Sequence, residues 1–84
     1  MRVAIADDSA LFREGLALLL ETVGAEVSAV ARSGDELLAA IAADVPDAVI
    51  LDIRMPPTFT DEGLRAAEAV RARHPGTAVL ALST

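Results

Sequence analysis

The chain has 84 residues and a formal net charge of −6, and it contains neither cysteine nor tryptophan. This length allows one domain at most, so residues 1–84 are expected to form a single unit. The lack of cysteine excludes disulfides and cysteine-based zinc sites, and the acidic balance argues against nucleic-acid binding by these residues themselves. The longest apolar runs, such as residues 16–20, are too short to span a membrane, so a cytoplasmic protein is expected.

Short apolar stretches alternate with segments of helical periodicity along the whole chain. The apolar stretches predict four strands, at residues 2–6, 25–31, 48–51 and 77–82. The periodic segments between them predict three helices, at residues 10–23, from Ser33 to Pro46, and from Thr60 or Asp61 to about Arg73. Strands joined by crossovers that hold a helix form a parallel sheet with helices on both faces, so the expected fold class is α/β.

Local signals mark the helix ends and the faces that pack inward. Ser9 is the expected first N-cap, with Asp8 competing, and Gly24 ends that helix. Ser33 and Glu36 have the spacing of a capping box. The expected inner faces are Leu11, Phe12, Leu16, Leu19, Leu20 and Val23 in the first helix, Leu37, Leu38 and Ile41 in the second, and Leu64, Ala67 and Val70 in the third.

Carboxylates follow two of the predicted strands. Asp7 and Asp8 come directly after the first strand, Asp52 ends the third, and Ser83 follows the fourth. Sites in open parallel sheets form beyond the carboxyl ends of the strands, so these side chains converge if the first and third strands are neighbours. A site with oxygen ligands alone suits Mg²⁺, with Mn²⁺ as the alternative.

These residues resemble the receiver domain of two-component response regulators over the whole chain. The opening, DDSALFREGL at residues 7–16, resembles the start of many LuxR-type (NarL-class) regulators. The stretch LDIRMPP at residues 51–57 is similar to the family's phosphoacceptor strand and loop, and Ser83 follows at the expected spacing. The resemblance implies a flavodoxin-like (CheY-like) fold.

The resemblance also implies a role for each site residue. Asp52 corresponds to the phosphorylated aspartate, and Ser83 to the hydroxyl that senses the phosphoryl group. Asp8 corresponds to a direct metal ligand, and Asp7 to a residue that acts through water or orients the site. The third protein ligand besides Asp8 and Asp52 is the main-chain carbonyl of Arg54.

A signalling function follows from those roles. A histidine kinase or a small phosphodonor would phosphorylate Asp52 with Mg²⁺, and the chain would not be an enzyme beyond slow hydrolysis of its own aspartyl phosphate. The phosphorylated domain would control dimerisation or an output domain. DNA binding for transcription regulation would come only through a C-terminal domain absent from this chain, and no membrane partner is expected.

The chain departs from the family pattern in three places. All seven basic residues are arginine, whereas the family expects a lysine after a fifth strand. The predicted elements stop after the fourth strand, so the last helix, strand and helix of the family are missing, which leaves residues 79–82 as an apolar edge and favours self-association. Residues 58–62 lengthen the loop before Gly63.

Two alternatives to phosphate signalling remain. One is a receiver-like interaction or dimerisation module that works without phosphorylation, and Mg²⁺ binding at the acidic residues would distinguish it. The other is an aspartyl-phosphate hydrolase, which is disfavoured because Arg54 stands where such enzymes carry a second aspartate.

Overall fold

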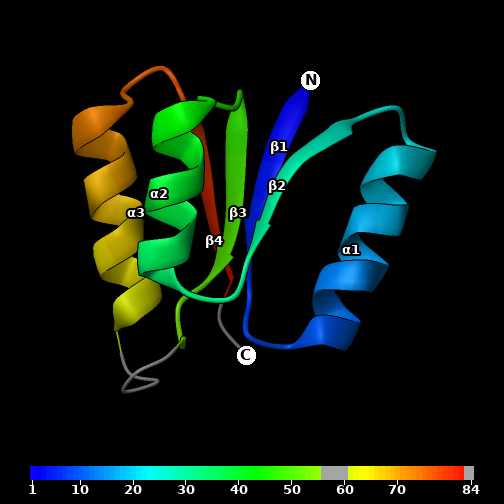
Figure 1. The fold of residues 1–84 in the computed structure, drawn as a ribbon, viewed down its shortest axis with the longest axis horizontal. Helices are drawn as coiled ribbons and strands as arrows, with labels where there is room; N and C mark the ends of the chain where they lie inside the picture. The colour runs from blue at the N-terminus through cyan, green and yellow to red at the C-terminus, as the bar shows by residue number, and fades with distance from the viewer. Residues whose placement is uncertain (56–60, 83–84) are drawn as a thin grey trace.

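The computed structural model describes residues 1–55 and 61–82 of the chain. Strands and helices alternate along it as the sequence predicts, with bounds that differ from the prediction by up to three residues (Figure 1). The strands are β1 (Arg2–Ala6), β2 (Glu26–Ala31), β3 (Ala48–Asp52) and β4 (Ala78–Leu82). The helices are α1 (Ala10–Thr22), α2 (Gly34–Ala43) and α3 (Glu62–Arg73).

The strands form one parallel sheet in the order β2-β1-β3-β4. β1 therefore lies between β2 and β3, and Ile5 pairs with Val30 on one side and with Ile50 on the other. Helices α2 and α3 cover one face of the sheet and α1 covers the other (Figure 1). The predicted α/β fold class is confirmed. The first and third strands are neighbours, which meets the condition under which the carboxylates after them were expected to converge.

The main core lies between the sheet and helices α2 and α3. Its buried members are Ala4, Ala6, Ala31, Leu37, Ile41, Val49, Leu51, Met55, Ala66, Ala67 and Val70. Leu38 is only partly buried against this core. The prediction for Leu64 is wrong, because this side chain is 46% exposed while Gly63, Ala66 and Ala67 are buried. Helix α3 approaches the sheet closely through these small residues. Leu64 comes directly after Gly63, so the helical turn of about 100° per residue directs it away from the sheet.

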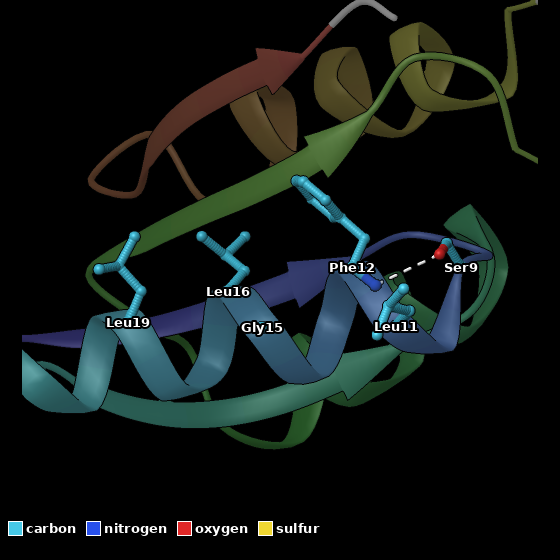
Figure 2. A pocket seen from close by; sticks show the side chains of 6 residues that line it. All are labelled: Ser9, Leu11, Phe12, Gly15, Leu16 and Leu19. Carbon is cyan, nitrogen blue, oxygen red and sulfur yellow. Dashed lines mark hydrogen bonds between the residues drawn. The ribbon is translucent and has the colours of Figure 1, made fainter.

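Helix α1 packs less deeply than its sequence predicts. None of its residues is buried; Leu16 and Leu20 are partly covered. The prediction of an inward position is wrong for the other four, since they are exposed: Leu11, Phe12, Leu19 and Val23. Phe12, Leu16 and Leu19 project from one side of the helix and line an open apolar hollow of about 460 Å³ (Figure 2). Periodicity predicts an apolar face correctly, but it does not reveal how much of the sheet lies beneath that face, and α1 contacts only β1 and β2 among the described elements.

Hydrogen bonds at the starts of α1 and α2 follow the predicted capping, whereas Asp61 stands at the N-cap of α3 without a side-chain capping bond. Ser9 Oγ accepts from the Phe12 N–H at 3.2 Å, and Ser33 Oγ accepts from the Glu36 N–H at 3.2 Å. Glu36 reaches back to the Arg32 N–H at 3.3 Å, one residue before the usual capping-box partner. Gly24 follows α1 with a φ of 88°, which suits glycine. None of the helices within the described residues is both long and apolar enough to cross a membrane.

Candidate functional site

Three carboxylates meet at the carboxyl edge of the sheet. Asp7 and Asp8 follow β1, and Asp52 ends β3. One carboxylate oxygen from each lies within 4.8 Å of the other two, with Asp7 and Asp52 buried and Asp8 exposed. The structure thus brings together the acidic residues that the sequence predicts, because adjacent parallel strands place their carboxyl ends at one edge.

The turn between β1 and α1 is held by contacts on both sides of Asp7. The Asp7 N–H donates to the Ala31 carbonyl of β2 at 3.0 Å, and the Asp7 carboxylate accepts from the Ser9 N–H at 2.8 Å. Arg13 reaches back from α1 and donates from a guanidinium nitrogen to the Asp7 carbonyl at 2.7 Å. The sequence analysis assigned no role to Arg13. Its position one turn into α1 was the available signal, because a long side chain there can reach back to the residues before the helix.

The electrostatics of the cluster favour a bound cation. Burial raises the pKa of Asp7, and the charges of Asp52 and Asp8 raise this pKa further. The Ser9 N–H and the Arg13 guanidinium act in the opposite direction on the same pKa. Like charges this close disfavour one another unless a proton or a cation compensates them. The three oxygen donors, without nitrogen or sulfur, form a donor set that Mg²⁺ or Mn²⁺ prefers.

The segment after β3 is anchored on three sides. The Arg54 N–H donates to Asp52 Oδ1 at 3.0 Å, so the carboxylate is oriented by the backbone two residues further along the chain. The Ile53 N–H donates to the Leu82 carbonyl of β4 at 3.0 Å, and the Ile53 carbonyl accepts from the Gly63 N–H of α3 at 2.8 Å. Met55 is fully buried and ends this segment in the core. The Arg54 side chain is exposed, and its main chain lies inside the anchored segment.

The fourth predicted site residue, Ser83, lies outside the described residues. The described strand β4 ends at Leu82, which pairs in register with Asp52. Strand β4 therefore ends at the same edge of the sheet as Asp52, and the role expected for Ser83 stays a prediction.

The whole of the described fold is similar to known response regulators. The family model "Response regulator receiver domain" matches residues 3–84. The solved signal receiver domain of the putative response regulator NarL from Mycobacterium tuberculosis superposes with a TM-score of 0.85 at 40% sequence identity, covering 98% of this chain and 64% of that one.

Two full-length relatives carry the similar segment within longer chains. The probable transcriptional regulatory protein NarL of Mycobacterium tuberculosis is 39% identical over 84 residues, which are 99% of this chain and 38% of that protein. A protein-glutamate methylesterase/protein-glutamine glutaminase of Haloarcula marismortui is 37% identical over 83 residues, or 99% of this chain and 21% of that protein. The matched family, the shared fold and the convergent aspartates lead to one conclusion: the chain belongs to the response regulator receiver domain family, with NarL-type relatives.

Proposed function

We propose that this chain is the phosphoacceptor unit of a two-component signalling protein and that Asp52 carries the phosphoryl group. The single observation behind the proposal is the convergence of Asp7, Asp8 and Asp52 within 4.8 Å at the carboxyl edge of the sheet. Asp52 is 7% exposed, and one of its oxygens is held by the Arg54 N–H. A carboxylate oriented in this way suits an in-line nucleophile for phosphoryl transfer.

The donor set around Asp52 fits Mg²⁺. Asp8, Asp52 and the main-chain carbonyl of Arg54 would hold the ion, and Asp7 would orient it through water. Bound Mg²⁺ supplies positive charge that offsets the negative charge of the phosphoryl oxygens. With a small acyl phosphate as donor, a carboxylate oxygen of Asp52 forms the new bond to phosphorus, and the acyl carboxylate leaves with the electron pair of the broken bond.

The NarL-type relatives support a proposal for the output and the partners. A histidine kinase or a small phosphodonor would supply the phosphoryl group in the cytoplasm, and Ser83 would hydrogen-bond it after transfer. The NarL relative is described as a transcriptional regulatory protein, which supports control of a DNA-binding domain outside this chain. Hydrolysis of the aspartyl phosphate would be slow, and no other enzymatic activity is proposed.

One observation keeps a second function in view. The side of α1 with Leu11, Phe12 and Leu19 is exposed and apolar, which suits an interaction or dimerisation module. Such a module would not need the acidic cluster. Calorimetric titration with Mg²⁺ separates the two functions, because lack of binding at Asp7, Asp8 and Asp52 would favour the interaction module over phosphate signalling.

Incubation of the natural full-length protein with acetyl phosphate and Mg²⁺ tests the proposal. We expect the wild type to incorporate phosphate and Asp52→Asn to incorporate none. Asp35→Asn is the matched control, because Asp35 is an exposed aspartate in the first turn of α2 and lies outside the acidic cluster. Equal incorporation by the wild type and Asp52→Asn would refute the assignment of Asp52.

A further inference from the structure

Helix α3 begins in direct backbone contact with the end of the strand that carries Asp52. A Cβ placed on Gly63 would lie 1.9 Å from the Asp52 carbonyl oxygen, 2.7 Å from the Asp52 carbonyl carbon and 2.5 Å from Ile53 Cα. The Gly63 N–H also donates to the Ile53 carbonyl at 2.8 Å. Glycine is therefore required here by space, and its positive-φ freedom is not involved, since only Gly24 has a positive φ among the described glycines.

The atoms that Gly63 meets are all backbone, so no side-chain rotation relieves a larger residue. Non-bonded carbon atoms prefer separations of about 3.5–4.0 Å, so a methyl group would force α3 and the strand end apart by roughly 1 Å or more. Gly34 of α2 makes a softer contact with the same helix, because its Cβ would lie 3.2 Å from Ala66 Cβ and 3.5 Å from the Glu62 carbonyl oxygen.

This contact acts on the atoms that matter for the proposed reaction. Asp52 Oδ1 accepts a hydrogen bond from the Arg54 N–H. Ile53, which lies between these two residues, is hydrogen-bonded to β4 through its N–H and to α3 through its carbonyl. A displacement of the Asp52 and Ile53 backbone therefore moves the carboxylate relative to Asp7 and Asp8. Mg²⁺ tolerates such a change poorly, because it requires nearly ideal octahedral geometry at short distances.

We propose that Gly63 is a positioning residue, which seats α3 on the backbone of Asp52 and Ile53 and thereby fixes the Asp52 carboxylate and the Arg54 main chain for Mg²⁺ and for the phosphoryl group. This inference rests on the proposed function. Helix propensity alone would predict the opposite result for Gly63→Ala. Alanine ranks above glycine inside a helix, so propensity predicts a more stable α3 and no damage to the site.

The test compares Gly63→Ala with Gly76→Ala in the natural full-length protein. Gly76 is the matched control, because a Cβ there meets nothing within 4 Å and its φ is not positive. Mg²⁺ affinity is measured by calorimetry at a temperature at which circular dichroism shows each variant folded. We expect Gly63→Ala to bind Mg²⁺ roughly tenfold more weakly or worse, in line with the loss of groups that orient metal ligands, and Gly76→Ala to match the wild type. Wild-type affinity in folded Gly63→Ala would overturn the proposal.

A second pair of variants covers the case in which Gly63→Ala does not fold. Gly34→Ala presses on α3 through the Ala66 side chain, and Gly34→Ala combined with Ala66→Gly removes that pressure. The proposal predicts a smaller loss of Mg²⁺ affinity in Gly34→Ala and its recovery in the double variant. Unchanged affinity in Gly34→Ala, or a loss that the double variant does not recover, would count against positioning by α3.

The backbone amide signals separate this inference from the proposed function. In nuclear magnetic resonance spectra of the metal-free proteins, Gly63→Ala is expected to shift the amide signals of Asp52, Ile53 and Arg54, whereas Gly76→Ala leaves them in place. If the wild type binds Mg²⁺ but is not phosphorylated on Asp52, the proposed function fails, and the ranking of these variants still decides whether Gly63 positions the site. Unshifted signals in Gly63→Ala would contradict the positioning role.

Discussion

Asp7 combines a buried carboxyl group with two neighbouring carboxylates, and both features raise its pKa. A pKa that is higher in the folded state than in the unfolded state costs stability at neutral pH, because the charged form is disfavoured on folding. This cost disappears as the pH falls through the pKa of folded Asp7 towards the value for the unfolded chain. We therefore expect Asp7→Asn to be more stable than the wild type at pH 7 without metal, and this difference to shrink at acidic pH.

The same substitution should weaken metal binding. Asp7→Asn removes a charge from the cluster, and we expect roughly a tenfold or larger loss of Mg²⁺ affinity. Urea denaturation across a pH series and calorimetric Mg²⁺ titration measure the two effects, with Asp35→Asn as the control for charge. A variant that is destabilised at pH 7 and binds Mg²⁺ normally would mean that Asp7 serves the fold alone.

Thr77 makes a buried hydrogen bond whose strength is testable. Its Oγ1 donates to the Pro46 carbonyl at 2.9 Å, and the residue is 6% exposed. Thr77→Val leaves that carbonyl without its donor, so we expect a loss of about 1–3 kcal/mol in the free energy of unfolding. Thr22→Val is the control, because the Thr22 hydroxyl makes a similar bond to the Leu18 carbonyl at 2.8 Å on an exposed helix surface. Similar losses in both variants would show that burial does not strengthen the bond.

Individual residues differ in how far the sequence predicts them. The acidic cluster could be predicted, since Asp7, Asp8 and Asp52 stand at the ends of recognisable strands. The contacts of Arg13 and Gly63 could not, because each depends on the distance between a helix and a strand end, which periodicity does not contain. Ser83 is predicted from spacing and lies outside the described residues.

Arg2 joins three elements at the edge of the sheet opposite the acidic cluster. Its guanidinium donates to Asp44 after α2 through both terminal nitrogens and to Glu26 of β2 through Nε at 3.2 Å. The Arg2 N–H also donates to Asp47 Oδ2 at 2.7 Å. The hydrogen bond from Arg2 lowers the pKa of Asp44. These charges are exposed, so the network is expected to contribute little and to weaken with salt.

The network makes a prediction about pH. A carboxylate with a lowered pKa in the folded state stabilises the fold above its unfolded pKa, and this contribution is lost as the pH falls through the lowered value. Arg2→Gln should therefore unfold at a slightly lower urea concentration than the wild type at pH 7, with a smaller difference at high salt. The difference should fade below about pH 4 as Asp44 becomes protonated. A difference that is constant across pH and salt would mean that Arg2 acts by packing.

The elements themselves were predictable to within about three residues at their ends. Strand stretches such as Arg2–Ala6 and caps such as Ser9 carry strong local signals. The inner face of α3 was less predictable, because Leu64 is the larger apolar residue and yet small residues allow the close packing of this helix. Helix α1 shows the same limit, since an apolar face alone does not specify what covers it.

Helix α1 leaves apolar surface exposed. Leu11 and Leu19 of α1 are 82% and 61% exposed, and both line the same open hollow beside the helix. An exposed apolar surface of this kind favours association. We therefore expect the chain of residues 1–84 to self-associate with increasing concentration in sedimentation velocity experiments.

Leu11→Lys combined with Leu19→Lys should reduce this association without unfolding the chain, because both side chains are already exposed. Val45→Lys is the control, because Val45 is 50% exposed but does not line the hollow beside α1. A wild-type chain that stays monomeric throughout the concentration series would contradict this prediction. An equal effect of Val45→Lys would show that the association does not occur through the exposed apolar side of α1.

The acidic residues of the chain are not spread evenly over the molecule. Three of its thirteen acidic residues meet at the carboxyl edge of the sheet, where they form the candidate metal site. Others, including Asp44 and Glu26, are neutralised locally by Arg2. Part of the net negative charge thus lies at the candidate metal site, where it would attract a cation.

The phosphorylated residue can be located directly. Borohydride reduction of the protein after treatment with acetyl phosphate and Mg²⁺ converts an aspartyl phosphate to homoserine, which peptide mass spectrometry places in the sequence. The account predicts homoserine at position 52 of the wild type, and none when Mg²⁺ is omitted. Homoserine at another aspartate, or none in the wild type with Mg²⁺ present, would contradict it.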